Sequence, residues 1–131
     1  METIADRPFN TAYHGAHLSR VAFPLGGIGA GMLCLEGTGA LSHVSLRHRP
    51  DVFHEPCVFA AVCVRRSGGH VARVLEGPVP TWKLFGSPNA GNGAPGRTYG
   101  LPRFATPEFC ARFPFGTVTL RDPGVPLVVE I

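Results

Sequence analysis

Short runs of alternating apolar and polar residues, separated by glycine and proline, make up most of this sequence. Alternation with a period of two is typical of β-strands, whereas an amphipathic helix repeats about every 3.6 residues. Residues 21–25 carry the chain inward, and the pattern then predicts strands at 29–36, 41–47, 57–66, 71–75, 108–113, 117–121 and 125–131. No helical pattern extends over ten residues. The sequence therefore predicts an all-β domain, an antiparallel β-sandwich of short strands.

The run at 57–66 is the clearest of these strands, because it is apolar on both faces. Strands with two apolar faces are typical of the centre of a sheet that is covered on both sides. The Gly68-Gly69 pair that follows is a good two-residue connector for a hairpin. We expect the 71–75 run to pair back on a central strand at 57–66.

Four glycines lie within residues 26–31, directly before an apolar run. A dinucleotide-binding loop would need its third glycine where Met32 stands and a helix after it, and neither requirement is met. The chain also lacks the Gly-Lys-Ser/Thr of a P-loop. We interpret this stretch as a close-packed glycine turn that feeds the first strand.

The pattern divides the chain into an irregular N-terminal arm at 1–20 and a β-sandwich domain at 21–131. Within the domain, residues 76–102 form a long connection rich in glycine and proline, of a length that is usually functional or disordered. The apolar run at 125–131 is followed by no turn or polar cap. We therefore expect the sandwich to be incomplete at its C-terminal end.

Charge and composition narrow the possible functions. The net charge is +3 and no five like charges occur in a row, which argues against nucleic-acid binding. No stretch of 18 apolar residues predicts a transmembrane segment. Residues 1–13 lack the apolar core of a signal peptide, which favours a cytoplasmic protein, although an exported protein without its leader would look the same.

The four cysteines form no CxxC pair, and we expect them to be buried free thiols. His54 and Cys57 could offer metal ligands, but no second pair stands at the spacing of a zinc site. The sequence therefore predicts neither a metal site nor a cofactor.

Residues 47–55 form the most chemically dense loop of the chain. Asp51 and Glu55 are its only close pair of carboxylates, and a curved loop could hold them roughly 5 to 10 Å apart, as in glycosidases. A solvated loop in which they neutralise Arg47 and Arg49 is the favoured interpretation. Two uses of the loop stay open: contact with a ligand or a neighbouring domain, and a surface ion network. The candidate contact residues are Arg47, His48, Arg49, Asp51, His54 and, from the long connection, Trp82.

Residues 22–31, together with the hairpin at 39–50 that ends in Arg49-Pro50, resemble the start of glycoside hydrolase family 116. Residues 113–120 and 122–127 are similar to later strands of the same family's N-terminal domain. The resemblance covers nearly the whole chain. It implies an N-terminal β-sandwich that packs on an (α/α)₆ catalytic barrel, where the nucleophile and acid/base carboxylates of a retaining β-glucosidase or glucosylceramidase lie. It therefore assigns no catalytic residue to this sequence.

Two other interpretations compete with a truncated, non-catalytic sandwich domain. The chain could be a free-standing β-module that binds a carbohydrate or a protein through Trp82, Phe85 and Tyr99, because sugar platforms need exposed aromatic rings. It could also be a fragment without a folded state of its own. No turnover of an aryl β-glucoside is expected from this chain alone.

Overall fold

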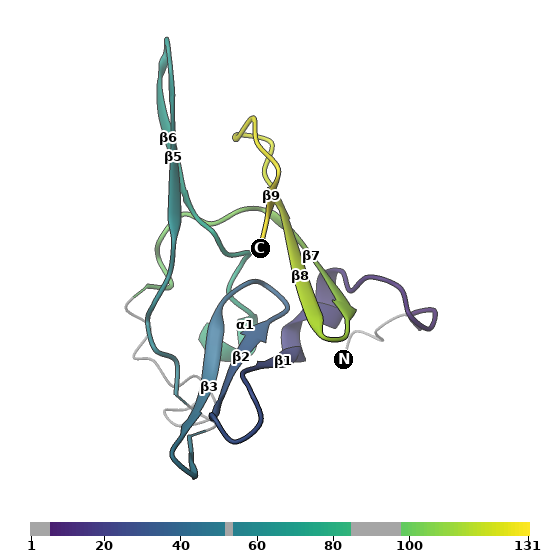
Figure 1. The fold of residues 1–131 in the computed structure, drawn as a ribbon. Coiled ribbons are helices and arrows are strands. Elements are labelled where there is room, and N and C mark those ends of the chain that lie inside the picture. Colours follow the sequence, from purple (N-terminus) through teal and green to yellow (C-terminus); the bar gives the residue numbers. More distant parts are fainter. Residues whose placement is uncertain (1–5, 52–53, 85–97) are drawn as a thin grey trace.

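The computed structural model describes residues 6–51, 54–84 and 98–131, and it confirms a mostly β protein (Figure 1). In the described part, the strands form three antiparallel sheets. The first sheet contains β1 (Ala22–Leu25), β2 (Met32–Glu36), β3 (Leu41–Leu46) and β4 (Arg49–Pro50). The second is a hairpin of β5 (Ala61–Arg66) and β6 (Gly69–Val74), and the third contains β7 (Thr106–Arg112), β8 (Phe115–Arg121) and β9 (Val129–Glu130).

Two short helices accompany the sheets. The 3₁₀-helix η1 (Gly15–Arg20) lies within the predicted N-terminal arm and buries Leu18. The α-helix α1 (Thr81–Leu84) lies within the long connection. Residues 85–97 of that connection, including Phe85, lie outside the described residues.

The glycine stretch is a tight turn, as predicted, but it joins two strands, β1 and β2, rather than leading into the first strand. Gly26 has φ +140°, and a Cβ atom built there would lie 2.4 Å from the carbonyl oxygen of Gly31. Gly31 has φ +101°, and its Cβ atom would lie 2.5 Å from the carbonyl oxygen of Ser45 on β3. Glycine is required at both positions because a side chain would collide with backbone atoms.

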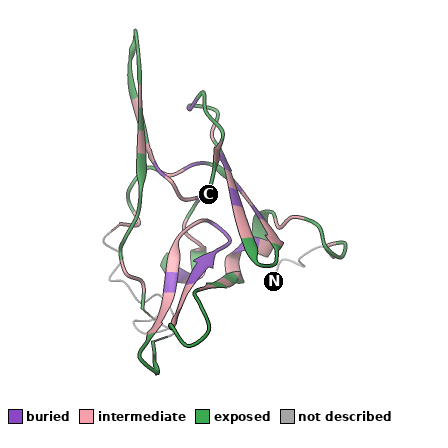
Figure 2. Ribbon diagram, in the orientation of Figure 1, coloured by how far each residue is buried: buried purple, intermediate pink, exposed green. Residues whose placement is uncertain are grey.

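The prediction of a central strand at 57–66 is wrong. The strand begins only at Ala61, and β5 and β6 form a two-stranded hairpin that projects from the rest of the molecule (Figures 1 and 2). Ala61 and Cys63 are exposed on one face, whereas Val62 and Val64 on the other pack against the core. Both faces look apolar in sequence, but alanine and cysteine are small enough to leave in water at modest cost.

The hairpin turn also differs by one residue from the prediction. Arg66 pairs with Gly69, so the two-residue loop is Ser67-Gly68 rather than Gly68-Gly69. Similarly, only Val129–Glu130 of the predicted 125–131 strand form β9, although Ile131 continues the pairing with β8 through two backbone hydrogen bonds to Val118.

The core joins η1, β2 and the third sheet. Phe104, Phe109, Val118 and Leu120 are the largest side chains that are fully buried. Tyr13 packs edge-on against Phe109 and pairs with it through two backbone hydrogen bonds, which ties the N-terminal arm to β7. Burial of each such phenylalanine contributes about 2–3 kcal/mol. The stacking of these sheets as a sandwich, and its truncation, stay predictions.

Candidate functional site

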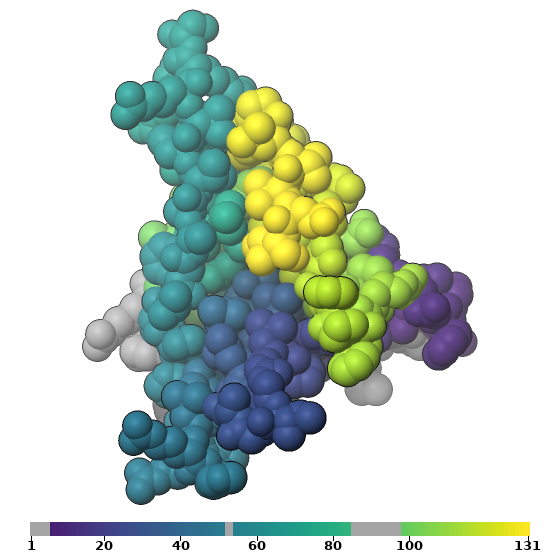
Figure 3. Space-filling view, in the orientation of Figure 1, coloured from purple at the N-terminus to yellow at the C-terminus, as the bar shows by residue number. Residues whose placement is uncertain are grey.

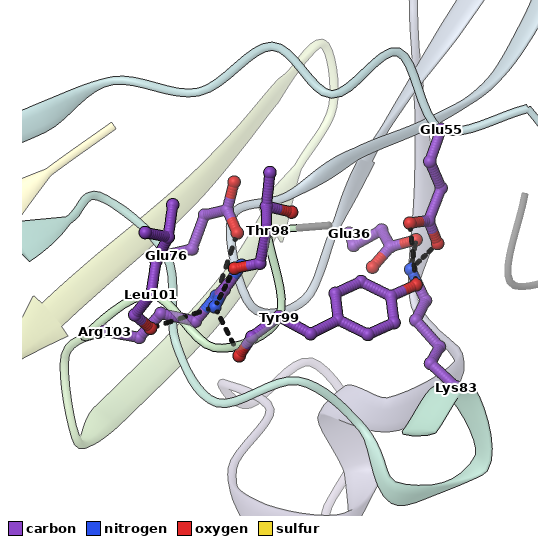
Figure 4. A network of polar contacts seen from close by, with 8 residues as sticks. All are labelled: Glu36, Glu55, Glu76, Lys83, Thr98, Tyr99, Leu101 and Arg103. Carbon is purple, nitrogen blue, oxygen red and sulfur yellow. Dashed lines mark hydrogen bonds and ion pairs between the residues drawn. The ribbon is translucent and has the colours of Figure 1, made fainter. Parts of the chain in front are cut away.

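A buried lysine lies at the centre of the most polar region of the fold (Figure 4). Lys83 extends from α1, and its side chain is only 3% exposed. Its Nζ donates a hydrogen bond to Oε1 of Glu36, 2.6 Å away at the end of β2, and forms a second ion pair with Glu55. The hydroxyl of Tyr99 donates to the other oxygen of Glu55 at 2.9 Å. We call these four residues the lysine cluster.

Local backbone geometry explains how the lysine reaches this position. The backbone N–H of Lys83 donates to the carbonyl of Pro80 at 2.9 Å, which starts the single turn of α1 after a proline-containing segment. Glu36 is fixed by the hairpin of β2 and β3, where its N–H donates to Ala40. The cluster therefore joins four segments that are separated in sequence.

A second ion pair lies beside the lysine cluster. Nε of Arg103 donates to Oε2 of Glu76 at 3.1 Å, and its Nη1 donates to the carbonyls of Thr98, Tyr99 and Leu101 (Figure 4). Burial raises the pKa of the Glu76 carboxyl, and the adjacent Arg103 guanidinium only partly opposes this shift. Burial, followed by the hydrogen bond to Glu55, also raises the pKa of Tyr99.

The chemistry open to the lysine cluster is limited by its contacts. The cavity that its residues line has a volume of about 30 Å³, which is room for a water molecule and far too little for a sugar ring. Glu36 and Glu55 both bind the same Nζ atom. Each carboxylate is therefore held in an ion pair rather than presented to a glycosidic bond, and the cluster acts as a crosslink between segments.

The predicted loop residues lie away from this cluster, at the end of the first sheet. Arg47 and His48 form the turn between β3 and β4, and Arg49 begins β4. Asp51 Oδ2 lies 3.4 Å from His54 Nδ1, and both side chains are about half exposed. Asp51 thus pairs with His54, and Glu55 points into the lysine cluster. Among the described residues neither carboxylate forms an ion pair with Arg47 or Arg49, so the interpretation in which they neutralise these arginines is wrong.

Trp82 lies apart from the loop, on α1. Its Nε1 donates to the carbonyl of Ser19 at 2.8 Å, and the guanidinium of Arg20 stacks 4.3 Å from the centre of its ring. Trp82 therefore packs α1 against η1, and a sugar would have to displace Arg20 to stack on that face. Its role as a ligand contact stays a prediction.

Sequence reasoning missed the residues that the structure brings together most tightly. They are Glu36, Glu76, Lys83 and Arg103. One signal was available: Lys83 is the only lysine of the chain, and it stands between Trp82 and Leu84. No local pattern pairs it with Glu36, which is 47 positions away.

Within the described residues, no group of three or more histidine, cysteine, aspartate and glutamate side chains is arranged to hold a metal ion. The four cysteines are free thiols, as expected, but the expectation that they are buried is wrong for Cys57 and Cys63, which are exposed. No helix among the described segments is long and apolar enough to cross a membrane.

The sequence matches the model of a known protein family. A family model described as beta-glucosidase 2, glycosyl-hydrolase family 116 N-term, covers residues 22–131. No curated protein matches the chain. The matched range begins at β1 and includes every strand of the three described sheets.

Proposed function

Because this chain belongs to glycoside hydrolase family 116 as an N-terminal domain, we propose that it is the non-catalytic domain of a β-glucosidase or glucosylceramidase. An N-terminal domain of this family normally accompanies a catalytic domain. In the proposal, hydrolysis of the β-glucoside takes place on an (α/α)₆ catalytic domain, and this chain packs against that domain.

The main support for a non-catalytic role is that the two buried carboxylates, Glu36 and Glu55, are both paired with Lys83. A retaining glycosidase uses two carboxyl groups about 5–5.5 Å apart, on either side of a bond that must fit between them. Here Glu36 and Glu55 share one lysine and face a cavity with the volume of about one water molecule. In the described part of the loop, Asp51 pairs with His54 in an exposed contact on the surface.

An apolar groove supports the docking role. The groove has a volume of about 510 Å³ and lies where the three sheets meet, with walls that include Leu25, Leu41, Phe59, Leu75 and Ile131. Phe59 is still 44% exposed. Large apolar surfaces of this kind mark sites where a partner or domain packs. The hairpin of β5 and β6 and the C-terminal segment lie side by side on this face of the molecule (Figure 3).

An assay with an aryl β-glucoside tests the non-catalytic role. The purified chain is expected to release no more aglycone than buffer does. The Glu36→Gln and Glu55→Gln variants serve as matched controls, since each removes one of the paired carboxylates. Turnover by the unmodified chain that either variant abolishes would contradict the proposal, because it would assign the chemistry to the lysine cluster.

A further inference from the structure

Two loops that the sequence singles out separately meet at one end of the first sheet (Figure 1). The glycine loop joins β1 to β2, and the turn at Arg47 and His48 joins β3 to β4. The loops touch, because a Cβ atom on Gly31 would lie 3.0 Å from a methyl carbon of Leu46. We call residues 26–31 and 46–50 the basic tip.

The cationic side chains of the basic tip have no partner within the part of the chain that the structure describes. The side chains of Arg47, His48 and Arg49 make no hydrogen bond and no ion pair there. Elsewhere in the described residues, Arg73 binds Asp122, Arg103 binds Glu76, and Arg112 binds Asn10. The tip is therefore a place where positive charge is left available to an external group.

The backbone of the tip is unusual for its side chains. Arg47 has φ +52° and His48 has φ +58°, so two successive residues adopt the left-handed conformation. Two-residue turns of this type normally use asparagine and glycine, because other side chains are strained there. Strained residues of this kind cluster at binding sites. The turn keeps both basic side chains exposed where Asn-Gly would fold more easily.

A groove runs between the two loops. It has a volume of about 410 Å³, and its walls include Gly29, Gly31, Met32, His48 and Arg49. Glycine walls allow another backbone to approach closely. Ile28 at the rim is fully exposed and Leu46 is more than half exposed. The tip thus combines guanidinium groups, a methionine and bare aliphatic side chains, which are typical of protein interfaces.

We propose that the basic tip binds an acidic segment of a protein partner, with an aspartate or glutamate carboxylate on Arg47 and Arg49. Guanidinium groups bind carboxylates in a two-pronged geometry that fits them closely. Ile28 and Leu46 then cover an apolar side chain beside the acidic residue. Two arginines and one histidine are few for a nucleic acid or a lipid surface, both of which need wider fields of charge. The site is independent of the proposed docking on a catalytic domain.

Fluorescence anisotropy with a labelled probe peptide, four glutamates around one leucine, tests the proposal on the full chain. Binding is expected, with an affinity that falls as salt is added. The Arg47→Gln/Arg49→Gln double variant is expected to bind at least about fivefold more weakly. The matched control is Arg65→Gln, which removes an arginine of the β5–β6 hairpin that also has no partner among the described residues. It is expected to bind as the unmodified chain does.

A second double variant controls for a loss of binding that is caused by unfolding. Arg47→Lys/Arg49→Lys keeps the charge but removes the forked geometry, and it is expected to show an intermediate affinity. The proposal is overturned if the probe does not bind, or if Arg65→Gln weakens binding as much as the double variant. It is also overturned if vesicles of phosphatidylserine and phosphatidylcholine bind more tightly than the peptide and depend on the same arginines, since the tip would then recognise a lipid surface.

Discussion

Replacing Lys83 by methionine should destabilise the fold strongly. The ammonium lies 2.6 Å from Glu36, contacts Glu55, and belongs to a side chain that is 3% exposed. Methionine keeps the apolar stem of the lysine at similar volume. The variant therefore loses mainly the charge, and two buried carboxylates remain without their cation.

The magnitude follows from that geometry. Removal of one partner of a buried ion pair typically costs 3–5 kcal/mol, about the cost of leaving a charge uncompensated in the interior. A domain of this size has roughly 5–15 kcal/mol of total stability. We therefore expect Lys83→Met to lose about 3–5 kcal/mol of the free energy of unfolding, roughly a fifth or more of the total.

Urea unfolding measures this loss. Trp82 is the only tryptophan and its ring lies 5.5 Å from Nζ of Lys83, so its fluorescence reports on the site, and far-UV circular dichroism reports on the strands. The matched control is Arg121→Met, because Arg121 pairs with Glu108 at 3.6 Å with about half of its side chain exposed. This exposed pair should contribute less than about 1 kcal/mol.

A triple variant separates the charge from other effects. Lys83→Met combined with Glu36→Gln and Glu55→Gln has no uncompensated charge, so it should recover about half or more of the lost free energy. The reasoning is refuted if Lys83→Met costs no more than Arg121→Met, or if the triple variant is as unstable as the single one.

Three further predictions concern the loops and the second ion pair. Gly26→Ala should lower the free energy of unfolding in urea by about 1–3 kcal/mol, because Gly26 has a φ of +140° and an added Cβ atom would lie 2.4 Å from a carbonyl oxygen. Gly68→Ala, where the added Cβ atom meets open space, should lower it by less than about 1 kcal/mol. Equal losses in the two variants would contradict this reasoning. His48→Gly should raise the stability by about 0.5–1 kcal/mol as it relieves the left-handed backbone, and a loss of stability would argue against strain. Burial raises the pKa of Glu76 in the folded state. The contribution of this shift to the free energy of unfolding is therefore fully present below the unfolded pKa of about 4.3, and it is lost as the pH rises through the folded pKa. The advantage of the unmodified chain over Glu76→Gln should therefore shrink as the pH rises above about 4.3, and an advantage that grows would contradict the shift.

The local features of the fold could be predicted from the sequence. The hairpin of β2 and β3 follows from two alternating runs on either side of a glycine turn, and β7 and β8 follow from the same pattern. The turn at residues 26–31 follows from its glycines, because no other residue fits Gly26. These features depend on residues that are close together in the sequence.

The lysine cluster could not be predicted in that way. Lys83 meets Glu55 across 28 positions and Glu36 across 47, so its partners are set by how the segments pack. The same limit explains the wrong prediction for β5. Alternation shows which face of a strand is apolar, but packing decides whether anything covers the face that carries Ala61 and Cys63.

The most direct test of the proposed function is calorimetric titration of this chain with a separately prepared family-116 catalytic domain. A one-to-one complex with a large negative heat-capacity change is expected, since that change marks the burial of apolar surface. Phe59→Asp, in the apolar groove, should weaken the complex at least about tenfold. Phe9→Asp should leave it unchanged, because Phe9 is exposed in the N-terminal arm, and it is not among the residues that line the groove. Absence of a complex, or equal loss in both variants, would contradict the account.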